Sequence, residues 1–508
     1  MHNNVNWRSW VTLGLLLPVA GCMVGPKYKR PETIAARVDR FANAPQETPD
    51  ANEVAKPDLW WERFGDPTTA ELVKRALEQN YDLKASAARV MQAQAALGQA
   101  SGLRWPSISY GLTGDRSKRF FNFGGAGESP QAPVLPPPFD QLDLSFLSGG
   151  FSPLTTTWSQ SVSATYIVDL FGRLRRAQRA AWADLLAADT SRQALINSVI
   201  ASVIQARVNI ATLQRRLDIA QANIKSWERT LEITEHRYEQ GIIGPLDVRL
   251  ARTNLEAARS QEPMVRQSLA TAVHALDVLL AEPPGASSLL PSTLPELPDL
   301  EPVPIGVPAA LLDRRPDVKA AELQLVAANE RIGVSIAQLY PDLSLTASYG
   351  LSGIAWRDIW NHSAETEIYG GVMNLSAPIF QGGALRAQVR AAKARFEELA
   401  AQYAGTALTA MREVEDALVG ELLLQQQLEH VELQVREAQA GEELSQQRYE
   451  QGVENILTVL VSQRQRRVAE EQLAILKGQI WITRVNLHLA LGGDWDRSEP
   501  SQEDVAAK

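Results

Sequence analysis

The second half of this chain repeats the first, and the repeat limits the possible folds more than any other feature. The motif Arg-Tyr-Glu-Gln-Gly occurs at residues 237–241 and again at 448–452, an offset of 211 residues. Gly172 and Gly383 are separated by the same offset, so segments 172–238 and 383–449 align without a gap. Two ungapped segments of equal length indicate one rigid element in each repeat.

The periodicity of these segments predicts very long helices. Apolar or small residues recur at alternating steps of three and four, which is the seam of a coiled coil. At 1.5 Å per residue, each helix is expected to be about 100 Å long. The same seam resumes over 248–279 and 459–490, so each long helix is predicted to turn back as a hairpin, with Gly241 and Gly452 as C-caps of positive φ. A shorter helix of about 33 residues from Leu72, stacked on the first return helix, is expected to complete the antiparallel partner of the first long helix.

Before each long helix the pattern changes to the alternation of β-strands. Four strands are predicted, at Ser107–Leu112, Thr155–Val168, Leu343–Tyr349 and Tyr369–Ala377. They approach the nine to eleven residues that cross a bilayer, with Tyr110, Trp158, Tyr166, Tyr349 and Tyr369 as candidates for interface girdles. Four strands cannot close a membrane barrel, so this interpretation requires further copies of the chain. Two soluble hairpins are the alternative. The Gly- and Pro-rich segment 124–153 is expected to be an exposed loop.

The N-terminus has the pattern of a lipoprotein signal. Arg8 precedes an apolar stretch from Trp10 to Val19, which ends in Val-Ala-Gly before Cys22, the single cysteine of the chain. Ten apolar residues are too few to span a bilayer, so the stretch is interpreted as a signal peptide, with Cys22 as the lipidated residue. An ordinary signal peptide followed by a chance cysteine is the alternative. No later run approaches transmembrane-helix length.

Composition argues against several classes of function. A net charge of −9 argues against a nucleic-acid partner, which needs a basic surface. The histidines at 236, 274, 362, 430 and 488 have no metal-ligand spacing, and the chain has no phosphate-binding glycine loop. No catalytic residue, metal site or cofactor is therefore predicted, the chain is not expected to be an enzyme, and the histidines are expected on solvated helix faces.

Several motifs, in this order, resemble the TolC-like outer membrane efflux family, in its lipoprotein (OprM/NodT-type) branch. They are Cys-Met-Val-Gly-Pro at 22–26, Trp-Trp-Glu-Arg-Phe-Gly-Asp-Pro at 60–67, Asp-Leu-Phe-Gly-Arg-Leu-Arg at 169–175, Arg-Arg-Pro-Asp-Val at 314–318, Pro-Ile-Phe-Gln-Gly-Gly at 378–383 and the two Arg-Tyr-Glu-Gln-Gly motifs. The resemblance implies a mainly α fold with a transmembrane β region. It implies a homotrimer whose chains each give four strands to a 12-stranded β-barrel, and whose helix hairpins form a periplasmic α-barrel. It also implies a periplasmic adaptor protein and an inner-membrane pump of the resistance-nodulation-division (RND) type as partners.

These expectations divide the chain into six parts. They are a signal peptide (1–21), a lipid-anchored equatorial segment (22–71), a first repeat (72–282, with its β-hairpin at 106–171), a Pro-rich equatorial linker (283–308), a second repeat (309–492, with its β-hairpin at 341–382) and a C-terminal tail (493–508). Within the second repeat, Arg314-Arg315-Pro316-Asp317 is interpreted as a helix start with proline in its first turn rather than a binding site.

The hairpin tips are the functional end that the resemblance implies. Arg237, Tyr238, Gly241, Arg448, Tyr449 and Gly452 are the candidate adaptor contacts, and simple capping and packing of the hairpins is the alternative. The family commonly places a Leu and, four residues later, an Asp at the periplasmic aperture; here Leu457 matches but Val461 replaces the acid. An aperture closed by apolar contact is therefore predicted, with Asp247 as a possible source of negative charge.

The function predicted from these features is a passive exit duct for drugs or other toxic small molecules, anchored in the outer membrane and extending into the periplasm. A duct for type I protein secretion or for metal-ion export would use the same fold. A lipid-anchored periplasmic coiled-coil scaffold would explain the helices but not the strands.

Overall fold

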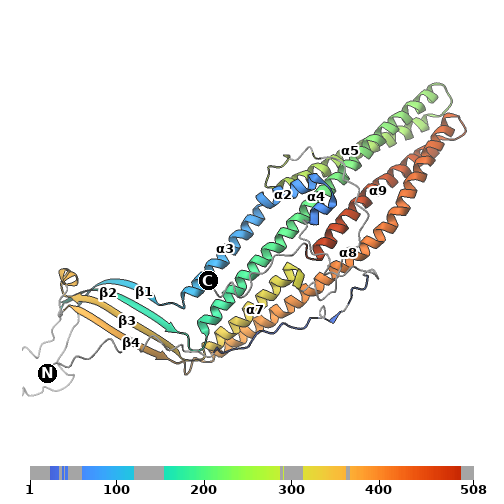
Figure 1. The fold of residues 1–508 in the computed structure, drawn as a ribbon. Helices are drawn as coiled ribbons and strands as arrows, with labels where there is room; N and C mark the ends of the chain where they lie inside the picture. Colours follow the sequence, from blue (N-terminus) through green and yellow to red (C-terminus); the bar gives the residue numbers. More distant parts are fainter. Residues whose placement is uncertain are drawn as a thin grey trace, which may run out of the picture. The chain divides into compact units, whose positions relative to one another are not determined.

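A computed structural model describes residues 23–33, 37–38, 40–43, 60–118, 154–286, 290, 313–361 and 366–493 (Figure 1). Cys22, the predicted loop 124–153, His362, most of the predicted linker 283–308 and nearly all of the predicted C-terminal tail lie outside these residues. The chain divides into two compact units, which are described separately. Of the described residues, those within 1–27, 97–180 and 330–393 form a sheet unit, and the others form a helical unit.

The sheet unit contains the four predicted strands, each antiparallel to the next. They are β1 (Ser107–Lys118), β2 (Leu154–Val168), β3 (Asp342–Gly353) and β4 (Glu367–Ser376), in the order β1-β2-β3-β4. The strand pairs of both repeats thus join in one sheet through β2 and β3, with Trp158 opposite Gly353 and Val168 opposite Leu343. β1 and β4 form the two edges of this sheet.

The two faces of the sheet differ in polarity because the register aligns residues of like kind. One face carries serines and threonines from adjacent strands, and their hydroxyls bond across strands at Ser109–Ser163 (2.8 Å) and Thr165–Thr346 (3.3 Å). The opposite face is apolar and aromatic. It carries Ile108, Tyr110, Leu112, Trp158, Val162, Tyr166, Leu345, Tyr349, Leu351, Tyr369, Met373 and Leu375.

The two ungapped repeat segments are two helices of identical length, as predicted. α4 (Arg173–Glu239) and α8 (Ala384–Glu450) contain 67 residues each, and the return helices α5 (Pro245–Leu279) and α9 (Ile456–Ala490) contain 35 each. Every predicted seam position in these four helices is buried or half-buried except Tyr238. Burial of this apolar seam therefore explains why such long segments remain helical, because helical propensity alone contributes little in water.

The predicted short helix at the start of the first repeat was wrong in one respect, because two helices occupy it. α2 (Pro67–Gln79) and α3 (Tyr81–Gly102) meet at Asn80. The Asn80 side-chain oxygen accepts hydrogen bonds from the backbone N–H groups of Asp82 (2.9 Å) and Leu83 (3.1 Å) and so caps α3. Its amide donates to the Leu279 carbonyl (2.9 Å), which places the start of α3 at the end of α5, the predicted end-to-end stacking.

The second repeat begins with α7 (Pro316–Ala337), where proline occupies the first helical position as predicted. The preceding residue, Arg315, is buried. It pairs with Asp317 (2.7 Å) and Glu413 (2.8 Å) and donates to the carbonyl of Ala490 at the end of α9 (3.0 Å). Arg315 therefore joins α7, α8 and α9, and the predicted helix start is confirmed.

An aromatic cluster forms the core of the helical unit near the end of α9. A 3-10 helix, η2 (Trp60–Phe64), packs against α4, α5 and α9. His488 of α9 is stacked on Trp60, with ring centroids 5.5 Å apart, and Phe64 is stacked on Trp481 at 5.2 Å. The expectation that His488 lies on a solvated helix face was wrong, because the aromatic motif at 60–67 folds over it.

One segment of α4 is more apolar than the sequence analysis indicated. An 18-residue window in this helix is apolar enough, by length and composition, to cross a membrane. Half of that window is buried within the chain, as in the core helix of a soluble domain. Burial against neighbouring helices accounts for its composition.

Candidate functional site

The two hairpin tips have the same backbone construction. Gly241 (φ 71°) and Gly452 (φ 74°) end the long helices in the left-handed conformation that glycine adopts without strain. The next N–H, of Ile242 or Val453, returns to the carbonyl of Arg237 or Arg448 at 3.0 Å. The expected C-caps are therefore confirmed. The return helices start differently, because α9 has an Asn455 side-chain cap whereas α5 follows Gly244 and begins with Pro245.

The side chains of the two tips are not equivalent, although their sequences are. Tyr449 is buried (4% exposed), whereas its counterpart Tyr238 is 46% exposed. The guanidinium of Arg237 covers the Tyr449 ring at 4.5 Å from its centroid and donates to the Tyr449 carbonyl (2.5 Å). Arg448 instead pairs within its own hairpin, with Glu454 at 3.6 Å. The first tip thus holds the second through Arg237.

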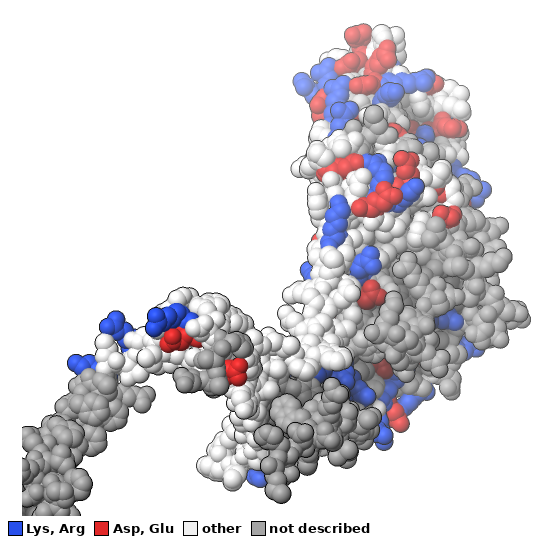
Figure 2. All heavy atoms as spheres, turned by 60° about the vertical axis from the view of Figure 1, so that its left-hand side comes forward, with Lys and Arg blue, Asp and Glu red and all other residues white. Residues whose placement is uncertain are grey.

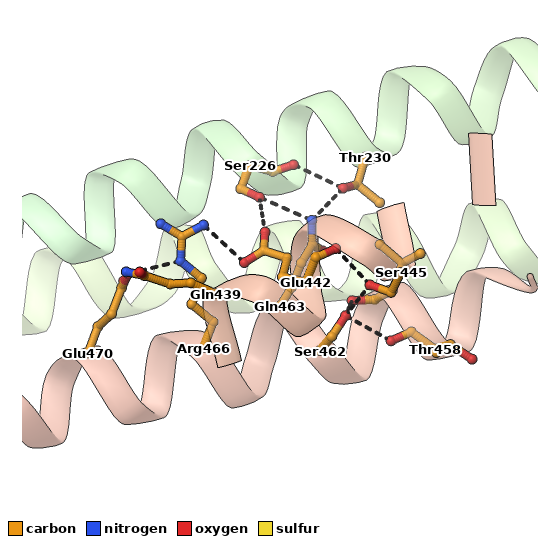
Figure 3. Close-up of polar contacts among 11 residues, drawn as sticks. Ser226, Thr230, Gln439, Glu442, Ser445, Thr458, Ser462, Gln463, Arg466 and Glu470 are labelled. Atoms are coloured by element: carbon orange, nitrogen blue, oxygen red, sulfur yellow. Dashed lines mark hydrogen bonds and ion pairs between the residues drawn. The ribbon is translucent and has the colours of Figure 1, made fainter. Parts of the chain in front are cut away.

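Behind the tips, polar side chains of α4, α8 and α9 contact one another (Figure 3), in addition to an apolar cluster that includes Trp227 of α4 and Leu460 of α9. The buried amide of Gln463 donates to the hydroxyls of Ser226 (3.0 Å) and Thr230 (2.8 Å). Glu442, also buried, pairs with Arg466 (3.2 Å). Because these groups require specific partners when buried, the network fixes the register of the two hairpins.

A second polar layer lies within the second hairpin. The hydroxyls of Ser445 on α8 and Ser462 on α9 are 2.6 Å apart, and Ser462 also donates to the Thr458 carbonyl at 3.0 Å (Figure 3). Small hydroxyl residues at this level keep α8 and α9 close together. The predicted seam positions Glu442, Ser445 and Ser462 are therefore buried contacts without being apolar.

The candidate aperture residues lie on the first turns of α9 and α5. Leu457 and Val461 are one helical turn apart on α9 and both are exposed. Val468 and Ile475 follow Val461 at seven-residue spacing and are also exposed. Asp247 is half-buried in the first turn of α5. Arg464 and Gln465, both exposed, lie between Val461 and Val468, so the apolar surface at the start of α9 is limited to Leu457 and Val461. The site residues of the two tips belong to one unit of the chain.

The residues after Cys22 are held at the start of α4, within the sheet unit. The Val24 N–H donates to the carbonyl of Phe171 (3.2 Å), three residues after the end of β2. The Arg176 guanidinium donates to the carbonyl oxygens of Gly25 (3.2 Å) and Pro26 (3.1 Å). The chain next to the candidate lipidation site is therefore fixed beside the base of the sheet.

Arg176 itself is held by Glu330 of α7 at 3.0 Å, and both side chains are largely buried. A buried cation is stable only when it is paired and hydrogen-bonded, and Arg176 meets both conditions. The pair thus connects the N-terminal segment, α4 and α7. Sequence reasoning missed this role, although Arg176 directly follows the motif at 169–175 that carries the family resemblance.

The polar contacts at the tips and at the start of α4 do not form an ion-binding or catalytic site. Among the residues that the structure describes, no three His, Cys, Asp or Glu side chains are grouped so that they could hold a metal ion. The polar groups at the tips are engaged with each other and with backbone carbonyls. These contacts can position the helices, and they can break when the two hairpins move apart. They form no acid–base or nucleophilic arrangement.

Comparison with known proteins gives a consistent result over almost the entire chain. The family model described as "Outer membrane efflux protein" matches residues 72–282 and 307–493. The pyoverdine export outer membrane protein OpmQ of Pseudomonas putida is 31% identical over 460 residues, which cover 90% of this chain and 93% of that protein. The toluene efflux pump outer membrane protein TtgF of Pseudomonas putida is 30% identical over 509 residues, covering 96% and 97%.

Solved structures agree with this fold. The outer-membrane channel OprN superposes with a TM-score of 0.79 at 27% identity, covering 93% of this chain and 99% of that one. The CmeC outer membrane channel of Campylobacter jejuni has a TM-score of 0.80 at 21% identity, covering 96% and 98%, and so supports the fold alone.

Proposed function

The chain belongs to the outer membrane efflux protein family, and from that premise we propose that three copies form one continuous duct for small toxic molecules. As a member it is an outer-membrane efflux channel that extends into the periplasm, and not an enzyme. The single observation that carries the trimer proposal is the four-stranded sheet, with one apolar face and two free edges.

The sheet has the properties of one third of a 12-stranded barrel. Its aromatic face suits lipid, and its serine and threonine face suits a water-filled lumen. In a membrane, unpaired backbone groups at the β1 and β4 edges would each cost several kcal/mol, roughly, because lipid supplies no hydrogen bonds. Pairing β4 of one copy with β1 of the next satisfies them all, and the number three comes from the family resemblance.

Cys22 is proposed to carry the lipid anchor. Residues 24–26 bond to Phe171 and to Arg176 of α4, which holds the chain after Cys22 beside the end of β2, at the level where the sheet would leave the bilayer. An acyl chain on Cys22 would enter the membrane from there. Lipid labelling that is lost in Cys22→Ser would support this assignment, and labelling retained in that variant would contradict it.

The partners proposed are a periplasmic adaptor protein and an inner-membrane pump of the RND type. The exposed Tyr238 and the loops after Gly241 and Gly452 are the candidate adaptor contacts, and Arg237 and Tyr449 hold the two tips together. Adaptor cross-linking that is unchanged by charge reversal at both Arg237 and Arg448 would favour a purely structural role for the tips.

The substrates proposed are drugs, solvents or other toxic small molecules. Relatives are named for toluene, antibiotic and pyoverdine export, so the chemistry of the cargo varies within the family. The serine and threonine face offers a hydrated surface without strong selectivity. Type I protein secretion and metal-ion export remain alternative uses of the same duct, and a coiled-coil scaffold remains the alternative from another class.

Reconstitution tests the proposal directly. The purified full chain should run as a heat-modifiable trimer on gels and should give stable single-channel conductance in planar bilayers. Deleting the gene for this chain should raise the sensitivity of the cell to toxic small molecules. A protein that is folded and helical but never conducts would support the scaffold instead.

A further inference from the structure

The end of the sheet remote from the helices carries a structured turn that the function above does not use. After β3, residues Trp356–Trp360 form the 3-10 helix η4, which folds back onto the aromatic face of β2 and β3. Ile359 is completely buried there, and its carbonyl accepts a hydrogen bond from the Gln160 side chain. The Asp358 carboxylate accepts from the Ala355 N–H (2.8 Å) and holds the start of the turn. η4 is therefore a fixed element and not a loose loop.

Three tryptophans gather at this end. The Trp158 ring lies against Gly114 of β1, where any Cβ would be 2.5 Å from the ring, so glycine makes room for it. Trp356 meets Trp158 edge to face at 4.9 Å, and Trp360 follows at 5.9 Å. Trp356 and Trp360 remain 48% and 58% exposed. Large amphipathic rings exposed at the rim of a membrane sheet suit the headgroup boundary.

Three basic residues lie at this end of the sheet, on β1 and η4. Arg116 and Lys118 are two and four residues beyond Gly114 on β1, and the register places both on the face of Trp158. Arg357 lies between the two η4 tryptophans in sequence and is 88% exposed, with only a 3.7 Å contact to Asp358. Within the described part of the chain, Arg116 and Lys118 form no ion pair. Figure 2 shows Lys and Arg side chains gathered toward this end of the sheet, with fewer acidic ones beside them.

The nearby carboxylates offset this charge only in part. Asp115 lies on the opposite face of β1, and Asp358, which is 3.7 Å from Arg357, also accepts from the Ala355 N–H. Glu367 shares the aromatic face but lies on β4, where it accepts from the Tyr349 hydroxyl (3.4 Å). Positive charge and exposed aromatic surface thus coincide on β1 and η4.

We propose that Arg116, Lys118, Arg357, Trp356 and Trp360, here called the basic aromatic rim, bind the phosphorylated headgroups of lipids in the outer leaflet of the outer membrane. The inference rests on the proposed function, because it places this face in lipid. Guanidinium groups bind phosphate oxygens in pairs, and the ammonium group of Lys118 adds a point charge. Tryptophan rings beside them favour a lipid rather than a soluble phosphate, since the rings need an apolar phase.

Binding of lipid A, a glycolipid with two phosphates, to the full-length protein in detergent tests the proposal. We expect the triple variant Arg116→Gln, Lys118→Gln, Arg357→Gln to bind at least about tenfold more weakly than the wild type, because each basic residue near an anionic lipid surface adds to affinity. The matched control is Arg215→Gln, Arg229→Gln, Arg249→Gln, which removes three exposed cations from α4 and α5. The control should bind like the wild type.

Two further probes identify the ligand. Dephosphorylated lipid A should bind wild type at least about tenfold more weakly, in proportion to the lost phosphate contacts. Inorganic phosphate at millimolar concentration should not compete. Equal binding by the rim and control variants, equal binding of the dephosphorylated lipid, or competition by free phosphate would each overturn the proposal.

Channel measurements separate this inference from the function itself. The rim variant should still form trimers and conduct, since its changes lie outside the polar face and the tips. If the triple variant does not assemble, Arg357→Gln alone, which changes one exposed residue of η4, should still weaken lipid A binding relative to the wild type, by a smaller factor. A wild-type protein that does not conduct would refute the proposed duct function. Normal conductance together with unchanged lipid A binding by the rim variant would refute only the proposed lipid-binding role of the basic aromatic rim.

Discussion

Three buried or half-buried arginines in this chain act by binding backbone carbonyls at places where segments meet. Arg176 holds the N-terminal segment, Arg237 holds the second tip, and Arg315 holds the end of α9. An arginine can serve such a junction because its planar group offers five donors, while a nearby carboxylate or ring offsets its charge. The two tip glycines could be predicted from sequence because their role is local. The arginines could not, because their partners are 150 to 212 residues away.

Replacing Arg176 by methionine should strongly destabilise the sheet unit. The variant would leave Glu330 buried without its partner, which costs about 3–5 kcal/mol, and would release the carbonyls of Gly25 and Pro26. We expect a lower melting temperature and faster proteolysis after residue 22.

The double variant Arg176→Met, Glu330→Met provides the control. Removing both charges should recover much of the lost stability, because no uncompensated ion remains. Fast proteolysis should persist, since the carbonyl contacts are still absent. A double variant as unstable as Arg176→Met would contradict this explanation.

Tyr28 should make the N-terminal segment sensitive to alkali. Burial, the negative charge of Glu322 and a hydrogen bond to it (3.2 Å) raise the pKa of Tyr28. The folded state therefore holds this proton more tightly than the unfolded state, whose pKa is about 10. Its stabilising contribution is complete below pH 10 or so and is lost as pH rises through the folded-state pKa. Thermal melting from pH 9 to 12 should fall more steeply in wild type than in Tyr28→Phe; parallel curves would disprove the assignment.

At the scale of elements, periodicity predicted the long helices and strands because their burial follows one regular face. It could not predict the break at Asn80 or the turn η4. Asn80 interrupts no apolar pattern, and its capping role depends on the adjoining end of α5. The exposed Trp356 and Trp360 with Asp358 between them were a signal for η4, but a five-residue turn has no period.

Because the two tips differ in their contacts, substitutions at the equivalent positions 237 and 448 should differ in how far they destabilise the second tip. Arg237→Ala should weaken the second tip by about 2 kcal/mol, since it removes a cation–π contact and a charged hydrogen bond. Arg448→Ala removes only an exposed pair and should cost less than about 1 kcal/mol. Hydrogen exchange of residues 449–455 should accelerate clearly more in Arg237→Ala. Equal acceleration in both variants would mean that the contact does not hold the tip.

The exposed apolar pair Leu457 and Val461 at the start of α9 leads to a prediction for gating. If Leu457 and Val461 line the aperture, closure does not depend on carboxylates, so acidic pH and divalent cations should change conductance little. Val461→Asp should introduce sensitivity to both, because a ring of three carboxylates binds cations and protons. Bilayer recordings of the two channels at pH 5 and with Mg²⁺ make the comparison. Identical behaviour would show that Val461 is away from the aperture.

At the scale of the whole molecule, the repeat explains why sequence was so informative. Each half supplies the same helix hairpin and strand pair, so an error in one half is visible against the other. What sequence did not contain is how the copies differ. Arg237 and Arg448 have different partners because Arg237 contacts the other repeat at Tyr449, whereas Arg448 pairs with Glu454 of its own hairpin.

The two free edges of the sheet have a consequence for heredity as well as for structure. In the proposed trimer, closure of the barrel requires an intact β1 and an intact β4 from each of the three chains. One defective chain therefore inactivates a trimer that contains two wild-type chains. A cell making equal amounts of wild type and a variant with prolines in β4 would form intact rings at only about one in eight. Such an allele should therefore be dominant, with drug resistance falling far below half when both are co-expressed; resistance near half would mean that faulty chains are excluded before assembly.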